Sequence, residues 1–476
     1  MYRAMQGFPI AIMLTSAWQA QGLNSDLVER WDAHKDDDFG QLYPSTKRKT
    51  FLLDLAWDCV ETIATLRSHR IPEPQEAWQD VSRSEKRLLS QIDAILSCGR
   101  EIVLSISEMA FDPDLSDPDR VYAILMVIGC VDEEIWIRKA VDILQRAALN
   151  SPEERLAAIE SMCLIPHPRV REFLAPLLDH HESNVRAAAL EILAYRGQLG
   201  DKDVMRAIND SSPQVLTQVA ANLDRLETSG VGEAHERLLT HSDEQVVRSA
   251  FYLGVWQSSP RAKHRMYELC MAERGSFAEA IVFLALLGDE RDLAIIRSLI
   301  VGGTNRLALR AAGYFGHPDL IPLLTDVLRN AEEEIANETA VALNRITGAN
   351  LTKTVEKFDY EPGDQEFFDQ PPPGQVVLLP STDYVAWSNW YTDNKVTFES
   401  NTRLRRGKQF GSSILLEELE IWISDRADRA ITYLELRKMT QEGCPRFHPL
   451  DFVAVQEASL RELKRWEKEG RFRQLE

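Results

Sequence analysis

The chain has 476 residues, of which 44% are hydrophobic and 27% charged, and a formal charge of −20. Its length suits several domains or one long repeat array, and its composition excludes wholesale disorder. Residues 401–476 hold 15 Lys and Arg against 13 Asp and Glu, so a charge of −22 falls on residues 1–400. Because such an acidic surface repels phosphate backbones, we expect no nucleic-acid partner.

The amino-terminal stretch MYRAMQGFPIAIMLTSAWQAQG has an apolar core, Ile10 to Leu14, that is too short for a secretory signal peptide. The longest other apolar run, at residues 121–131, is shorter than the ~18 residues that a membrane span needs. The six cysteines form no CxxC pair and show no zinc-type spacing to histidine. We therefore expect a cytoplasmic protein with free thiols and no membrane partner. Helical periodicity at residues 50–66 and 84–106 predicts a helical amino-terminal region over residues 1–115.

From about residue 116 to residue 350 the sequence repeats itself, and one unit reads SNVRAAALEILAYRG at residues 183–197. Large apolar anchors recur every 28–31 residues, at Leu193, Leu223, Leu253, Leu284, Phe315 and Leu343. Four residues before each anchor stands a side chain no larger than valine, and three residues before it stands an apolar one. This spacing marks one face of a helix, and the small column lets successive helices approach closely.

Each unit also has a first helix, for example over residues 168–179 and 317–330, with proline where a helix start tolerates it. Two helices in every unit predict an all-α fold, an α-solenoid of stacked helix pairs over residues 116–350. Residues 359–380 are acidic and rich in proline, and an aromatic stretch follows, so we expect an extended linker over residues 351–400. Ala430, Ile431 and Leu434 restore the anchor spacing, which predicts a helical cap over residues 401–476.

The unit SNVRAAALEILAYRG resembles the short bacterial HEAT repeats first noted in phycobilisome lyases, and the resemblance implies a HEAT-like solenoid. The carboxyl-terminal part is similar to a family of uncharacterised bacterial HEAT-repeat proteins that are often encoded beside type VI secretion components. The matching residues are Trp390, Arg403, Gly407, Ala430, Leu434, Glu435, Leu436, Phe447 and Gln456. The run RLRRGKQFG is more basic than the family pattern. The resemblance implies a link to secretion and brings no chemistry with it.

Three classes of enzyme share the HEAT repeat. In HEAT-repeat hydroxylases, paired His-Glu dipeptides in one repeat phase bind two irons. Here His181-Glu182 lies 12 residues before the anchor Leu193, whereas His235-Glu236 lies 18 residues before the anchor Leu253. The two dipeptides therefore occupy different parts of their units and should not bind one metal together. The acidic charge disfavours a DNA glycosylase, and no feature specific to tetrapyrroles marks a bilin lyase. GxSxG, P-loop, HExxH and GxGxxG motifs do not occur. We expect a protein that is not an enzyme and has no metal or cofactor, with a bilin-lyase-like or DNA-glycosylase-like HEAT-repeat enzyme as the alternative.

Two groups near the carboxyl terminus are candidate partner-binding residues. The aromatic group is Trp387, Trp390 and Tyr391, and its alternative role is a lid on the end of the array. The cationic group is Arg403, Arg405, Arg406 and Lys408, and its alternatives are a phosphate site, a solvated turn or an internal ion-pairing contact. We expect a protein-binding scaffold or chaperone-like adaptor for a type VI secretion effector or spike component. An immunity protein that neutralises a toxin is the alternative within this class.

Overall fold

The computed structural model describes residues 45–73, 76–109, 117–223, 231–271, 279–301, 305–357, 375–398, 402–422, 425–440 and 444–473. The chain forms two compact units. The first comprises Met1–Ala250, Ile423–Ala430 and Gly443–Leu463, and the second comprises Phe251–Trp422, Ile431–Glu442 and Lys464–Glu476. Each unit is described by itself below.

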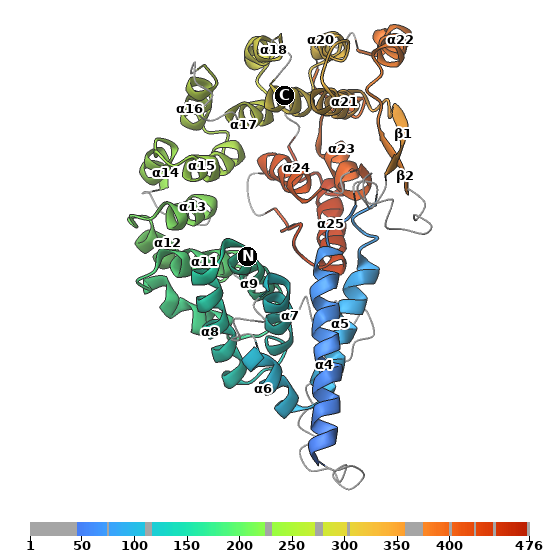
Figure 1. Cartoon of the computed structure of the whole chain (residues 1–476). Coiled ribbons are helices and arrows are strands. Elements are labelled where there is room, and N and C mark those ends of the chain that lie inside the picture. Colours follow the sequence, from blue (N-terminus) through green and yellow to red (C-terminus); the bar gives the residue numbers. More distant parts are fainter. Residues whose placement is uncertain are drawn as a thin grey trace. The chain divides into compact units, whose positions relative to one another are not determined.

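Helices stacked in pairs build the first unit (Figure 1). Its first described helices are α4 (Ser45–Ser68), α5 (Ser82–Ser97) and α6 (Arg100–Met109), and α4 packs on α5. The repeats follow as α7 (Pro118–Ile128), α8 (Glu134–Asn150), α9 (Pro152–Leu164), α10 (Val170–Leu174) with the 3-10 turn η3 (Ala175–Asp179), α11 (Ser183–Tyr195), α12 (Asp201–Ala207), α13 (Pro213–Asn222), α14 (Val231–Leu239) and the start of α15 (Glu244–Trp256). The second helices stack on one another, α7 on α9, α9 on α11 and α11 on α13.

Capping residues explain where several of these helices begin. The Asp117 carboxylate accepts hydrogen bonds from the backbone N–H groups of Asp119 and Arg120, and Pro118 stands at the first helical position of α7. Ser151 caps α9 in the same way, again with a proline following. Each such cap stabilises a helix by about 1 kcal/mol, so the loop sequence fixes the start of the second helix in these repeats.

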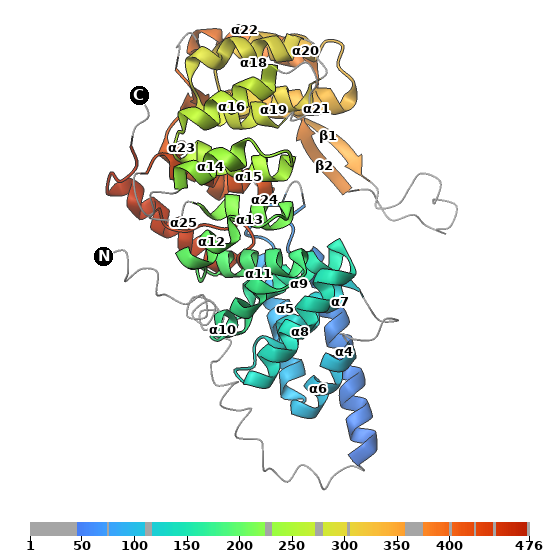
Figure 2. The same cartoon turned by 90° about the vertical axis from the view of Figure 1, so that its left-hand side faces the viewer.

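The second unit continues the pattern from the end of α15. Its helices are α16 (Pro260–Met271), α17 (Ala280–Leu287), η5 (Glu290–Asp292) with α18 (Leu293–Val301), α19 (Arg306–Phe315), η6 (Pro318–Leu320) with α20 (Ile321–Val327), and α21 (Glu333–Thr347). Figure 2 shows α18, α20 and α22 (Tyr384–Asn394) along one side of this unit, with α19 and α21 beside them. The described part of the chain also contains the 3-10 turn η8 (Lys395–Phe398), helix α23 (Ser412–Glu417), the π-helical turn η9 (Glu418–Trp422), α24 (Arg426–Lys438) and α25 (Val453–Lys468). Helices α24 and α25 contribute to both units.

Two short antiparallel ribbons interrupt the helices of the second unit. Strand β1 (Thr352–Lys357) pairs with β2 (Gln375–Pro380), with Thr354 opposite Leu378, and β3 (Leu404–Arg405) pairs with β4 (Lys408–Gln409). The structure therefore differs from the predicted extended linker over residues 351–400. Residues 352–357 and 375–380 are extended but paired, and residues 384–394 are helical because Asp383 caps them through the N–H groups of Val385 and Ala386.

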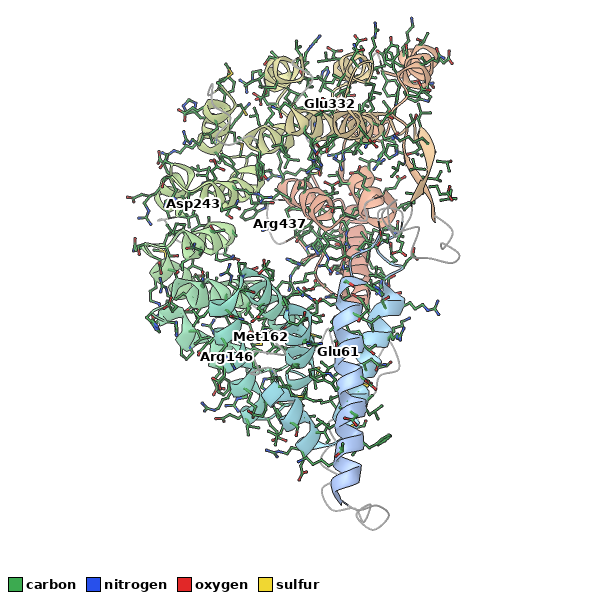
Figure 3. The ribbon with its side chains drawn as sticks, viewed as in Figure 1. Glu61, Arg146, Met162, Asp243, Glu332 and Arg437 are labelled. Carbon is green, nitrogen blue, oxygen red and sulfur yellow. The ribbon has the colours of Figure 1, made fainter. Side chains whose placement is uncertain are left out.

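The repeat columns lie in the core, which confirms the predicted all-α solenoid of stacked helix pairs. All six anchors are at most 4% exposed. Of the small residues four positions before them, Ala189, Val219, Ala280, Ala311 and Thr339 are fully buried, and Ser249 is half-buried. The register extends upstream as predicted, because Met162 of α9 is fully buried as well (Figure 3). A helix of ten to fifteen residues is marginal alone, and this stacking is what stabilises each one.

Candidate functional site

The aromatic group lies on α22, which packs against α20 at the end of the array. Trp387 is fully buried, and its indole N–H donates to the Ser381 carbonyl oxygen at 2.7 Å. The ring centroids of Trp387 and Trp390 are 6.0 Å apart, with the rings edge-on, and the ring centroids of Trp390 and Phe398 are 5.7 Å apart. Trp390 and Tyr391 are half-buried. Trp387 is therefore part of the lid on the array and cannot contact a partner directly, since its side chain has no surface in solvent.

The cationic group lies on the β3–β4 hairpin, inside the second unit. Arg405 is fully buried. Its Nη2 atom lies 2.5 Å from a carboxylate oxygen of Glu435, and its Nη1 atom lies 3.7 Å from one of Glu418. Arg406 pairs with Glu418 at 3.3 Å. The prediction that this group faces a partner is wrong for Arg405, because carboxylates of the predicted cap neutralise it within the unit. Lys408, which pairs with Glu417 at 2.6 Å, is the exposed member of the group.

Arg403 closes the carboxyl end of α19. Its Nε and Nη2 atoms donate to the carbonyl oxygens of Phe315 and Tyr314, both at 2.9 Å, and Nη2 also donates to Glu435 at 3.1 Å. The last carbonyl groups of a helix have no partner within the helix, so a guanidinium at this position satisfies them. Burial lowers the pKa of Arg403 to about 10, which leaves the group charged at neutral pH.

Residues of the β3–β4 hairpin and of α24 also bond to the carboxyl ends of the neighbouring helices α21 and α17. The backbone N–H groups of Arg406 and Gly407 donate to the carbonyl oxygens of Arg345 and Ile346, at 2.7 and 2.8 Å, in the last turn of α21. Lys438 Nζ donates to the Leu286 and Leu287 carbonyl oxygens, at 3.1 and 2.5 Å, at the end of α17. Burial lowers the pKa of Lys438 to about 8. We name the set Arg403, Leu404, Arg405, Arg406, Gly407, Glu418, Glu435 and Lys438 the clasp.

Gly407 shows why the clasp needs glycine in its turn. Arg406 and Gly407 have φ angles of +52° and +72°, as a two-residue hairpin turn of the primed type requires. A Cβ atom on Gly407 would lie 2.5 Å from the Thr347 carbonyl oxygen. The hairpin can therefore approach the end of α21 only because this residue has no side chain.

A second buried polar network lies in the first unit, and no motif in the sequence predicted it. Arg70 and Glu85, whose side chains are 1% and 2% exposed, pair at 3.1 Å, and Arg70 also reaches Glu160 at 3.2 Å. Arg70 donates to the Leu450 carbonyl oxygen and Glu85 accepts from the Val453 N–H, both at 2.7 Å. Burial raises the pKa of Glu85, and Arg70 opposes that shift. The network ties α4 and α5 to a segment more than 350 residues later in the chain, a pairing that no local motif announces.

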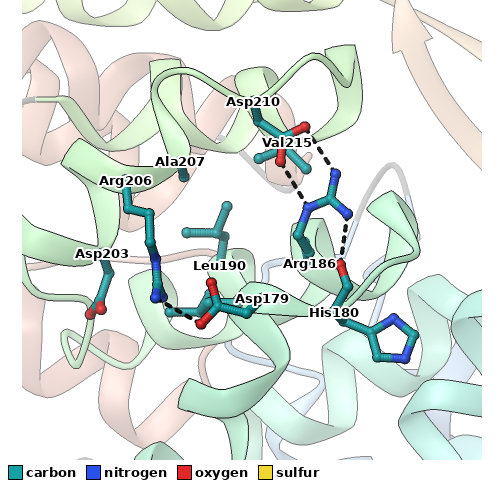
Figure 4. Close-up of a pocket in the computed structure, with 10 residues that line it drawn as sticks. Asp179, His180, Arg186, Leu190, Asp203, Arg206, Ala207, Asp210 and Val215 are labelled. Atoms are coloured by element: carbon teal, nitrogen blue, oxygen red, sulfur yellow. Dashed lines mark hydrogen bonds and ion pairs between the residues drawn. The ribbon is translucent and has the colours of Figure 1, made fainter.

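A polar cavity of about 280 Å³ lies beside α11, α12 and η3 in the first unit (Figure 4). Ion pairs run along its wall, with Arg206 and Asp179 at 2.8 Å and Arg186 and Asp210 at 2.8 Å. The apolar side chains of Leu178, Leu190 and Val215 contribute to the lining. These side chains neutralise one another in pairs. Each pair joins an element of one repeat to an element of the next, so the cavity wall connects neighbouring repeats.

The two His-Glu dipeptides lie in different surroundings. His181 is exposed, with 80% of its side chain in solvent, whereas His235 is buried and its Nε2 atom lies 2.9 Å from the Ala250 carbonyl oxygen. Within the ranges that the structure describes, no three His, Cys, Asp or Glu side chains gather as metal ligands would. No helix among the described residues is both long and apolar enough to span a membrane.

Comparison with known proteins agrees with this geometry. The family model described as HEAT repeats matches residues 137–223, from α8 to the end of α13. The array is HEAT-like in its fold. No curated protein matches it.

Solved structures with similarity include YibA of Escherichia coli, at 17% identity and a TM-score of 0.27 over 61% of this chain and 96% of that one. Human deoxyhypusine hydroxylase in complex with glycerol matches at 17% identity and a TM-score of 0.23, over 62% of this chain and 96% of that one. An engineered protein matches at 15% identity and a TM-score of 0.22, over 84% and 99%. These values are too low to transfer an activity to this HEAT-like chain.

Proposed function

We propose that this chain is a protein-binding scaffold that catalyses nothing by itself. The observation that carries the proposal is the clasp, which bonds to the carboxyl ends of three successive second helices, α17, α19 and α21. In a solenoid each repeat otherwise contacts only its neighbours, so the array bends easily. Because the clasp bonds to three repeats, it fixes their spacing. A binding surface that is already held in one shape loses less conformational entropy when it binds a partner.

The chemistry of the thiols supports a role without catalysis. Burial raises the pKa of Cys130 and Cys163 far above that of an ordinary thiol, and it raises the pKa of Cys270 to about 12. A thiol nucleophile needs the opposite shift, because only the thiolate attacks. The six cysteines are free, and on this ground we propose a reducing compartment, the cytoplasm.

For the partner we propose a type VI secretion effector or a spike component. The support is the resemblance of the carboxyl-terminal part, whose motif residues Arg403, Gly407 and Glu435 belong to the clasp. The test is purification of the tagged chain from its source bacterium, followed by size-exclusion chromatography and mass spectrometry. We expect an equimolar complex with an effector or spike protein.

Three results would count against this proposal. A stoichiometric metal or pigment in the purified protein would favour an enzyme. If the bound effector kills cells that lack the chain and spares cells that also express it, an immunity protein would be favoured. Normal secretion in a strain that lacks the chain would remove the secretion link.

A further inference from the structure

The β1–β2 ribbon carries apolar side chains on an exposed face. The pairing places Val376 opposite Glu356 and Leu378 opposite Thr354, all on one side of the ribbon. Val376 is 69% exposed and Leu378 is 56% exposed. The other side, with the buried Val377, is covered within the second unit, where α21 packs on β2. A two-stranded ribbon is marginally stable in water, and a third strand with a covered apolar face stabilises such a structure.

The outer edge of β1 presents backbone groups that point away from β2. The Ser381 N–H donates to the Leu351 carbonyl oxygen at 2.8 Å, so these two residues form a pair of the hydrogen-bonded kind. Because such pairs alternate along an antiparallel ladder, the N–H and C=O groups of Thr352, Thr354 and Glu356 point outward from β1. The edge has six residues and contains no proline, which are the properties that permit another chain to pair with it.

Charge decides which chain fits this edge. Residues 358–374, which join the two strands, hold Asp359, Glu361, Asp364, Glu366 and Asp369 and no Lys or Arg. Glu356 adds a carboxylate on the exposed face of β1. The strand also holds two lysines: the Lys353 ammonium group donates to the Thr382 hydroxyl at 3.1 Å, and Lys357 stands at the end of the strand opposite Gln375. Residues 352–374 together still carry six acidic residues against these two lysines. A second copy of this chain would bring the same carboxylates and another charge of −20, so like charges oppose self-pairing.

We propose that the outer edge of β1 accepts an extended, basic segment of a partner protein as a third strand. The outward groups of Thr352, Thr354 and Glu356 bond to its backbone, and a Lys or Arg of the segment faces Glu356. Apolar surface of the same partner covers Val376 and Leu378. This inference rests on the proposed scaffold function and names the surface and the chemistry of the partner.

The test uses the full chain and two synthetic eight-residue peptides, one alternating valine with lysine and one alternating valine with glutamate. The Thr354→Pro variant removes one outward N–H and leaves the bonds to β2 in place, since proline is tolerated where the N–H faces solvent. We expect the lysine peptide to bind and to protect the amides of residues 352–357 from hydrogen exchange. Thr354→Pro should weaken this binding about tenfold, whereas Thr354→Ala, which keeps the N–H, should change it less than about twofold.

A second variant covers the case in which proline disturbs the ribbon. Thr354→Lys keeps the backbone intact and repels a basic strand, so it should also weaken binding of the lysine peptide. Equal affinity of the parent, Thr354→Pro and Thr354→Lys for this peptide, or tighter binding of the glutamate peptide, would overturn the proposal. A dimer in light scattering that Thr354→Pro dissociates would overturn it in favour of a second copy. If Thr354→Pro still retains the partner purified from the source cell, the ribbon proposal fails and the scaffold function stands.

Discussion

Replacement of Glu435 by glutamine tests the clasp most directly. The Glu435 side chain is 1% exposed and accepts hydrogen bonds from Arg403 at 3.1 Å and from Arg405 at 2.5 Å. After Glu435→Gln, the fully buried Arg405 keeps a single carboxylate, Glu418, at 3.7 Å, which is beyond hydrogen-bond distance. Removal of one partner from a buried ion pair leaves an uncompensated charge and costs about 3–5 kcal/mol.

Glu417→Gln is the matched control, because its partner Lys408 belongs to the same hairpin. In that pair the two side chains are 33% and 59% exposed. An exposed ion pair contributes about 0–1 kcal/mol, so this variant should unfold almost as the parent does. The two substitutions are chemically identical, and the expected difference between them comes from burial alone.

The measurement is urea unfolding combined with hydrogen exchange of residues 402–410 and 431–440. A chain with two compact units need not unfold in one step, so exchange in these segments reports the clasp itself. We expect Glu435→Gln to lose exchange protection there and Glu417→Gln to keep it. Equal free energies of unfolding for the two variants would refute a clasp held by buried charge.

Other expected outcomes concern packing, turn geometry and pH. Ala189→Trp should overpack the fully buried face of α11 and lower stability by about 1–3 kcal/mol in thermal melts. Gly407→Ala should destabilise more than Gly470→Ala in the same melts, because both have φ near +70° but only Gly407 has a carbonyl oxygen within 4 Å. Burial lowers the pKa of His448 to about 4, so the neutral form favours the fold; its stabilisation should be complete above pH 6.5 and be lost as pH falls toward 4. In urea melts at pH 7 and pH 5, His448→Asn should reduce this pH dependence, because asparagine does not titrate in this range. The Asn amide oxygen can still accept the hydrogen bond from the Leu450 N–H that Nδ1 accepts in the parent. An unchanged pH dependence would exclude His448 as its source.

The repeat array could be predicted from sequence because its information is local. Residues four and three positions before each anchor decide how closely two helices approach, and they stand within one turn of that anchor. Ala189 and Ala311 are fully buried, as expected of small residues that let neighbouring helices approach closely. Two of the first helices, in residues 168–179 and 317–330, could be predicted as well, because a proline stands near the start of each. Short-range pattern and tertiary packing agree throughout this part of the chain.

The sequence offered an internal ion-pairing contact as one role of the cationic group, but the partners that form the clasp could not be predicted, because they are spread along the chain. A run of Arg403, Arg405 and Arg406 has the composition of an exposed basic loop, and the partner that buries it, Glu435, follows about thirty residues later. No periodicity links two such positions. For Trp387 the sequence left two roles open, a partner contact and a lid on the array, and the 2.7 Å hydrogen bond to Ser381 shows that it belongs to the lid. Charge and aromatic content alone do not show on which side of a surface a residue lies.

The placement of the motif residues separates what the resemblance explains from what it leaves open. Arg403 and Glu435 support helix ends of the second unit, and Gly407 permits the turn that reaches α21. A residue that closes a helix end stabilises the array in the same way whatever protein the array binds. We therefore expect proteins with this motif to share the clasp, while the choice of partner depends on surfaces outside it, such as the β1 edge. Exchange of residues 352–357 and 375–380 between two such proteins should then exchange their peptide preference and leave their unfolding curves in place.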